Sequence, residues 1–245
     1  MMNLEMGYAL KMRYLIKFTK ESNIKFVGHL ELMRTIQRIV RRSEVPVEYS
    51  YGFNPHIIMS LAQPLSVGVY SKGEYLDLSL VEKVPEKELI EKLNNATTPG
   101  IKFLDALRVE NITNQKKKPQ AMAAVEMANY TIKVKCNNED IVSDELKKMT
   151  KLSEWNITKK TKKGSKEVNI KPMLHKLEYK VEDNIVIFKV LLACGSKSNL
   201  SPKLLSEFIL NNTSFGKEIS FIEIFRHDML AAREGKLVSL IEYMK

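Results

Sequence analysis

Cysteine is scarce in this chain, because Cys136 and Cys194 are the only two among 245 residues. They show none of the close spacings that mark zinc or iron–sulfur sites, and two cysteines make no disulfide framework. Free thiols are usual in reducing compartments, so the composition favours a cytoplasmic protein. We therefore expect neither a thiolate metal centre nor a disulfide-stapled secreted fold.

Long apolar runs are also missing. No stretch approaches the ~20 apolar residues of a membrane-spanning helix. The first residues, MMNLEMGYALK, lack the basic start and apolar core of a secretory signal. Glycine is sparse, and neither a Walker nor a dinucleotide-binding glycine pattern is present. We expect no membrane contact and no nucleotide cofactor.

Histidine is rare as well. None of the histidines has the H-x-x-x-H or a comparable metal-ligand spacing, and they stand at His29, His56, His175 and His227. We expect no metal and no other cofactor.

Negative charge is in deficit. The chain has 39 Lys and Arg against 29 Asp and Glu, a net charge of +10 and an isoelectric point near 9.4. Residues 111–245 carry most of the excess, with 24 of the cations and 16 of the acids. This imbalance favours an anionic partner but does not specify a fold.

Residues 28–43 have the periodicity of an amphipathic helix. One half of the helical wheel is apolar, with Leu30, Leu32, Met33, Ile36, Ile39 and Val40. The other half is basic, with Arg34, Arg38, Arg41 and Arg42. Guanidinium groups bind phosphates bidentately and stack on bases, so four arginines without a lysine favour an RNA contact. A solvated basic surface, or arginines that complement the helix dipole, is the alternative interpretation.

A polar turn, Tyr51-Gly52-Phe53-Asn54-Pro55-His56, begins about eight residues after this helix. Glycine permits positive φ and proline restricts the residue before it, so the turn should be ordered. We expect Tyr51, Asn54 and His56 to contact the ligand beside the arginines. Phe53 is instead expected in the core, as is Trp155.

Residues 26–68 resemble the bacterial "radical SAM-linked protein" family. The matching motifs are GHLELxR at 28–34, RR with a following proline at 41–46, YSxGFNPH at 49–56 and PLxVG at 64–68. Members of that family are uncharacterised and are encoded beside, or fused to, a B12-binding or other radical SAM protein. The resemblance implies a radical SAM partner and a role with RNA or ribosomes. A radical SAM cluster normally needs three cysteines, so this chain would not be the radical enzyme itself.

The order of expected elements predicts an α+β fold made of two tandem ferredoxin-like (split βαβ) halves with antiparallel sheets. The first half has strands at 13–19, 45–50 or 57–62, 74–80 and 101–109, with helices at 28–43 and 85–95. The second has strands at 130–136, 156–162, 166–171, 174–181, 185–193 and 219–226, with helices at 140–151 and 201–210. We expect an N-terminal extension at 1–11, domains at 12–110 and 129–245, and a linker at 111–128.

Lysines cluster around a predicted hairpin near Lys163-Gly164-Ser165. A projecting ribbon of this kind can follow a phosphate backbone without reading its sequence. It can equally be a solubilising loop. The expected outer contacts with RNA are Lys159, Lys160, Lys162 and Lys163.

These patterns favour an RNA-binding accessory protein that serves a radical SAM partner. One alternative is a metal-independent endoribonuclease in which His29 and His56 act as base and acid. Another is a protein adaptor with no RNA contact. The sequence leaves all three open.

Overall fold

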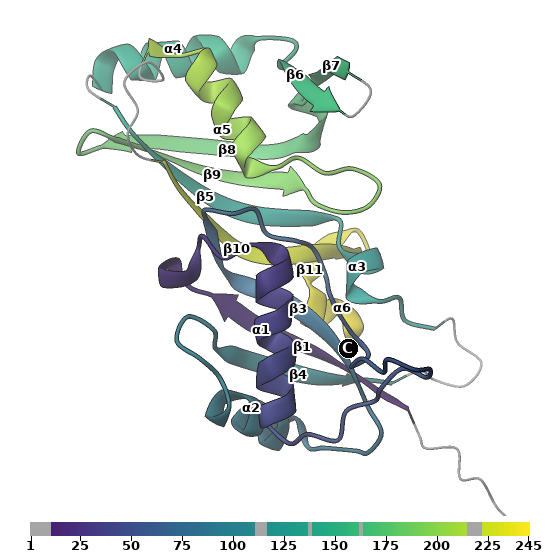
Figure 1. Cartoon of the computed structure of the whole chain (residues 1–245). Helices are drawn as coiled ribbons and strands as arrows, with labels where there is room; N and C mark the ends of the chain where they lie inside the picture. Colours follow the sequence, from purple (N-terminus) through teal and green to yellow (C-terminus); the bar gives the residue numbers. More distant parts are fainter. Residues whose placement is uncertain (1–10, 111–116, 137–138, 162–163, 215–221) are drawn as a thin grey trace, which may run out of the picture.

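The computed structural model of the chain describes residues 11–110, 117–136, 139–161, 164–214 and 222–245 (Figure 1). Its first half contains one short 3-10 helix at Ser22–Ile24. The other elements of this half are β1 (Met12–Lys20), α1 (His29–Arg42), β2 (Met59–Leu61), β3 (Val69–Leu80), α2 (Glu86–Asn95) and β4 (Phe103–Val109).

The second half begins with α3 (Ala121–Ala124) and includes a 3-10 turn at Lys171–Met173. The strands are β5 (Met127–Lys135), β6 (Asn156–Thr161), β7 (Gly164–Asn169), β8 (Leu174–Glu182), β9 (Ile185–Ala193), β10 (Ile222–Arg233) and β11 (Lys236–Ser239). The remaining helices are α4 (Glu139–Lys151), α5 (Pro202–Asn211) and α6 (Leu240–Met244).

One nine-stranded sheet runs through both halves, in the order β4-β1-β3-β10-β5-β9-β8, with β2 on β3 and β11 on β10. The pairings are antiparallel except for β3 with β10, where Val69 lies opposite Ile224 and Ser71 opposite Arg226. A separate hairpin pairs β6 with β7. The expected α+β class with antiparallel pairing is confirmed, whereas the domain boundaries stay a prediction.

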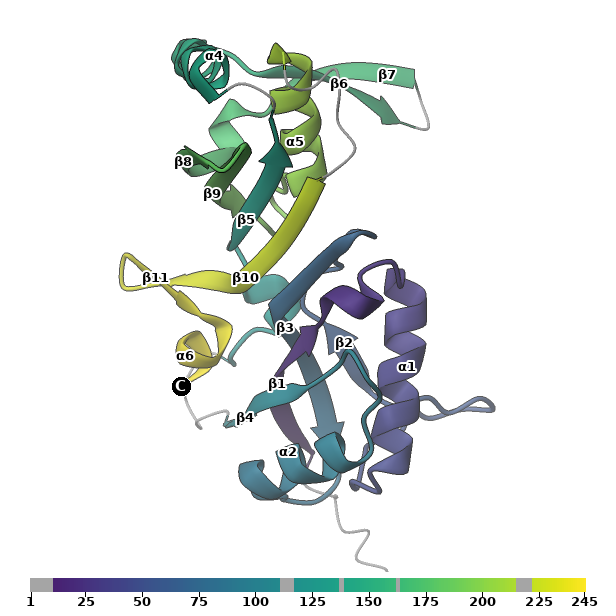
Figure 2. The same ribbon diagram turned by 90° about the vertical axis from the view of Figure 1, so that its left-hand side faces the viewer.

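Helices α1, α2, α4 and α5 pack on one side of this sheet. In β5 and β9, alternate residues are buried, and the buried set forms one core with α4 and α5. A second core lies under α1 and α2. In the first half the opposite side of the sheet is also covered, because Leu15 and Tyr75 join a cluster with Leu240 of α6. Figure 2 shows α1 and α6 on opposite sides of β1 and β3.

The C-terminal segment differs most from the sequence-based expectation. The last expected strand, 219–226, overlaps β10, which continues to Arg233 and is followed by β11 and α6. Polar residues from Arg226 to Asp228 interrupt the alternation of apolar residues. The sequence-based strand therefore ended at 226, before the end of β10. A capping signal was present, since the Ser239 side chain accepts a hydrogen bond from the Glu242 amide at 3.2 Å.

The strands expected at 45–50 and 57–62 are reduced to β2 and to isolated bridges such as Tyr49 with Ile57. Pro46 and Pro55 remove ladder donors in this region, which limits continuous pairing. Among the described helices, none combines the length and the apolar character needed to cross a bilayer.

Candidate functional site

Helix α1 presents its arginines outward because its apolar residues fit the sheet. Leu32, Ile36, Ile39 and Val40 are buried, while Arg34, Arg38, Arg41 and Arg42 are exposed. We call these four arginines the arginine face. Leu30 departs from the expectation, because it is 71% exposed. The buried stripe is narrower than half a wheel, and Leu30 lies about 130° from its centre at 100° per residue.

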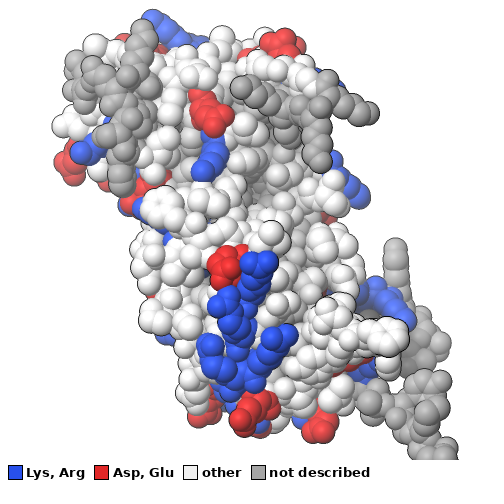
Figure 3. Space-filling view, in the orientation of Figure 1, with Lys and Arg blue, Asp and Glu red and all other residues white. Residues whose placement is uncertain are grey.

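The arginine face forms one continuous basic band along α1 (Figure 3). Glu31 is the acidic residue within α1. Its carboxylate oxygens lie 2.6 Å from Arg38 Nη2 and 3.7 Å from Arg34 Nη1. All three side chains are more than half exposed, with side-chain values of 55%, 68% and 51% for Arg38, Arg34 and Glu31. Exposed pairs of this type are weak and screened by salt. The guanidinium groups therefore remain accessible to a stronger anion.

An open hollow of about 680 Å³ lies at the C-terminal end of α1. Arg42 lines it and donates a hydrogen bond to the Ala96 carbonyl at 2.8 Å. Lys92 and Glu44 line it as well. The hydrogen bond to Ala96 orients Arg42, the last arginine of the band, toward the C-terminal end of α1.

The turn at 50–56 is ordered by hydrogen bonds between its ends. The Ser50 amide donates to the His56 carbonyl at 2.9 Å, and the His56 amide donates to Ser50 Oγ at 3.1 Å. Ser50 Oγ also lies 2.8 Å from His56 Nδ1. Gly52 adopts a φ of 114°, as its lack of a side chain permits. All residues from Tyr51 to His56 are exposed, so the expectation that Phe53 enters the core is wrong.

The turn and the arginine face do not form one pocket. In both ribbon views the turn projects from the body of the protein beside α1 (Figures 1 and 2). Within the described residues, its ring contact is with Lys11, whose Nζ lies 5.7 Å from the centre of the Tyr51 ring. The geometry thus offers two separate surfaces for contact.

The two candidate catalytic histidines occupy different surroundings. His29 is the first residue of α1, and its Nδ1 atom is buried without a hydrogen-bond partner among the described residues. His56 lies in the projecting turn with Ser50. Among the described residues, no hydrogen bond or ring contact joins the two imidazoles.

The lysine hairpin exists as β6 and β7, with Thr161 opposite Gly164. Lys159 and Lys160 belong to β6, but their side chains lie outside the part of the chain that the structure describes. Lys162 and Lys163 lie outside it entirely. Lys166, on β7, is exposed.

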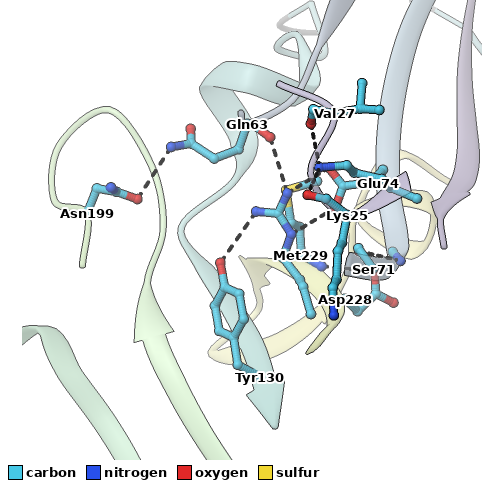
Figure 4. Close-up of polar contacts among 12 residues, drawn as sticks. Lys25, Val27, Gln63, Ser71, Glu74, Tyr130, Asn199, Asp228 and Met229 are labelled. Carbon is cyan, nitrogen blue, oxygen red and sulfur yellow. Dashed lines mark hydrogen bonds and ion pairs between the residues drawn. The ribbon is translucent and has the colours of Figure 1, made fainter. Parts of the chain in front are cut away.

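A buried ion pair joins the two halves of the sheet, and no local sequence pattern predicts it. Arg226 on β10 is 1% exposed. It donates two hydrogen bonds to Glu74 on β3, at 2.8 Å and 2.6 Å. Tyr130 Oη accepts from Arg226 at 3.4 Å, and the Gln63 carbonyl accepts at 3.3 Å (Figure 4). Burial acts to lower the pKa of Arg226, but the Glu74 carboxylate offsets it and the pKa is raised. The pair is therefore charged and fully hydrogen-bonded.

The thiols show no activated environment. Cys136 and Cys194 are both free and buried. Burial is the main factor that raises the pKa of each thiol, which disfavours the reactive thiolate. Within the described residues, no group of three or more His, Cys, Asp and Glu side chains is placed to hold a metal ion.

The comparisons with known proteins show the family. No curated protein matches the chain. Among solved structures, an unknown protein from Galdieria sulphuraria is similar, with 8% identity over 89% of this chain and 98% of that one, and a TM-score of 0.26. Such a low score carries no argument. A family model described as "Uncharacterized protein conserved in bacteria" (DUF2344) matches residues 13–202, and the chain belongs to this family.

Proposed function

We propose that this protein is a cytoplasmic RNA-binding accessory protein that acts with a radical SAM partner in RNA or ribosome modification. The observation that carries the RNA contact is the exposed, continuous arginine face of α1 (Figure 3). The partnership rests on the sequence motifs at 28–68 alone. A chain with two buried cysteines suits the accessory role better than the role of the radical enzyme.

Arginine explains why RNA fits better than a general acidic surface. From Arg34 to Arg42 the four guanidinium groups extend about 12 Å along the helix at 1.5 Å per residue. Such a row can bind successive phosphates bidentately. Carboxylates on a protein surface are seldom spaced as densely as the phosphates of a nucleic acid. The projecting turn would place Tyr51, Asn54 and His56 as secondary contacts. The lysines at 159–163 would serve as an outer electrostatic contact.

The same proposal includes the architecture. We infer that each half is a ferredoxin-like unit. The support is the strand order: β4-β1-β3 with β2 on the far side of β3, and β10-β5-β9-β8. The first half is connected as βαββαβ, and the second follows the same order with the β6–β7 hairpin inserted after α4. Folds of this kind host many functions, so the RNA assignment rests on the side chains and not on the fold.

Removing two guanidinium groups tests the RNA contact. Arg34 and Arg38 are exposed, so the R34A/R38A double variant should fold normally. We expect weaker RNA binding at low salt. The slope of log affinity against log salt should fall in magnitude by about 1.4, because each phosphate contact on a single strand contributes about 0.7. Fluorescence anisotropy across a salt series measures both.

The matched control is K83A/K87A, which removes two exposed lysines at the start of α2. It should bind RNA like the wild type. Equal affinities and slopes for R34A/R38A and K83A/K87A would contradict the proposal. Incubation of the wild type with RNA in EDTA should leave the RNA intact, because no contact among the described residues brings His29 and His56 together. Cleavage that is lost in His29→Ala would replace the accessory role with an endoribonuclease.

A further inference from the structure

The second half of the sheet has an open side that the helices do not cover. In β5, Ala128, Tyr130, Ile132 and Val134 are buried toward the helices, whereas Asn129, Thr131 and Lys133 alternate with them and are partly exposed. In β9, Lys189 is exposed on this same open side. Among the described helices, α4 contacts β8 and α5 contacts β5, in the core of the other side.

Three rings lie together on the open side, where the two halves of the sheet join. Tyr70 of β3 and Phe225 of β10 are opposite each other in the parallel pairing. Their ring centres are 4.8 Å apart. His227 meets Phe225 edge-on, with centres 4.6 Å apart. We call Tyr70, Phe225 and His227 the aromatic platform, and all three are partly exposed.

Polar contacts fix the outer rings of the platform. Tyr70 Oη donates to Glu223 Oε1 at 2.5 Å. The imidazole Nε2 of His227 lies 2.7 Å from the Thr131 hydroxyl. Burial, with the Glu223 hydrogen bond, raises the pKa of Tyr70 to about 12. Burial and the nearby Lys72 and Lys189 lower the pKa of His227. At neutral pH the platform therefore presents uncharged rings held in place.

Cations surround these rings. The Lys72 ammonium lies 5.8 Å from the centre of the Phe225 ring. In register across the sheet, Phe225 is followed by Thr131 and then by Lys189. Lys133 completes the group and pairs with Glu223 at 3.3 Å. The row from Tyr70 to Lys189 crosses four strands, or about 14 Å at the usual strand spacing.

We propose that the aromatic platform binds unpaired bases of single-stranded RNA, with Lys72, Lys133 and Lys189 at the flanking phosphates. Bases stack on aromatic rings, and a sheet surface that carries such rings between cations is a recurring way to bind single strands. A base inside a duplex is stacked between its neighbours and has no free face for these rings, so the platform selects single strands. This inference rests on the proposed RNA function and names its substrate class. The platform and the arginine face lie on opposite sides of the sheet.

Substitutions that replace a ring with a smaller apolar side chain test the platform. In F225L and Y70L the ring is lost, and we expect single-strand affinity to fall about tenfold per variant, within the range measured for stacked bases. In Y70F the ring remains without the hydroxyl, and affinity should stay within about twofold of the wild type. The probes are a fluorescein-labelled oligouridine of about 15 nucleotides and a blunt duplex of the same length.

Two controls separate the platform from other causes. F26L alters a ring that is 73% exposed outside the platform, and it should bind like the wild type. K72A/K189A removes exposed cations with little risk to folding and should weaken single-strand binding about tenfold. Circular dichroism checks each variant for folding.

The outcomes also separate this inference from the proposed function. Selective loss of single-strand affinity in F225L, Y70L and K72A/K189A supports the platform. Wild-type affinity in folded Y70L and K72A/K189A, with binding lost in R34A/R38A, overturns the platform and leaves the RNA function of α1 in place. A wild-type protein that binds neither probe at low salt overturns both. If the open side binds a protein and the platform variants keep the RNA affinity of the wild type, the platform proposal is also overturned.

Discussion

At the scale of single residues, context decides what each charged or aromatic side chain does. Arg38 and Arg226 are the same residue type in one chain. The first is exposed beside Glu31, and the second is enclosed with Glu74. An exposed pair exchanges readily with another anion, whereas a buried pair cannot, because separation would leave a charge in a low-dielectric interior. Arg38 is thus available to a ligand and Arg226 is structural.

His227 gives a pH prediction at this scale. Its pKa is lowered by burial and by Lys72 and Lys189, so the unfolded chain binds the proton more tightly than the folded one. Stability should therefore fall as pH drops below the unfolded value of about 6.5 toward the lower folded value. We expect the urea midpoint to fall less between about pH 7.5 and pH 5 in His227→Gln than in the wild type. An identical decline in both proteins would show that His227 does not contribute.

At the scale of elements, the pairing of β3 with β10 depends on one small residue. A Cβ added at Gly73 would lie 2.5 Å from the Cα of Asp228 and 2.5 Å from the His227 carbonyl. Both neighbours are backbone atoms of β10, so the contact cannot be relieved by a side-chain rotation. Glycine is needed here for close approach of two strands.

Gly73→Ala should therefore destabilise the protein by about 1–3 kcal/mol, as overpacking does elsewhere. Gly28→Ala is the control, because its nearest atom, Val67 Cγ2, is 3.9 Å away. The control should change the free energy of unfolding by less than about 1 kcal/mol. Urea denaturation measures both, and equal losses would contradict the role of the strand contact.

At the scale of the whole molecule, the Arg226–Glu74 pair links residues that are far apart in sequence, across the junction of the two halves. The Gln63 carbonyl and Tyr130 hydroxyl complete its hydrogen bonds from both halves (Figure 4). The net contribution of such a pair to stability is small, because the cost of removing both charges from water offsets their attraction.

Arg226→Met should cost about 3–5 kcal/mol, because it leaves the Glu74 carboxylate buried and uncompensated. The double variant E74L/R226M should recover part of this loss. Chemical denaturation of the four proteins of the cycle, the wild type, R226M, E74L and E74L/R226M, gives the coupling. A double variant that is as unstable as the sum of the two single variants would show that the pair is not coupled.

The local elements could be predicted from the chain alone. The arginine helix follows from apolar spacing and Pro46, and α5 follows from Pro202 and the Ser201 cap, whose side chain accepts from the Lys203 amide. Periodicity and capping are local, so a single sequence reveals them. The α+β class followed from the order of these elements.

How distant segments meet became visible in the folded chain. It paired residues 69–71 with 224–226, buried Arg226 against Glu74, and aligned Tyr70 with Phe225 on the open side. It also placed Phe53 in solvent on a turn that projects beside α1. Long-range packing and register decide which strands are neighbours, and local periodicity carries no information about either. The exposed arginines were therefore predictable from the chain, and their separation from the turn was not.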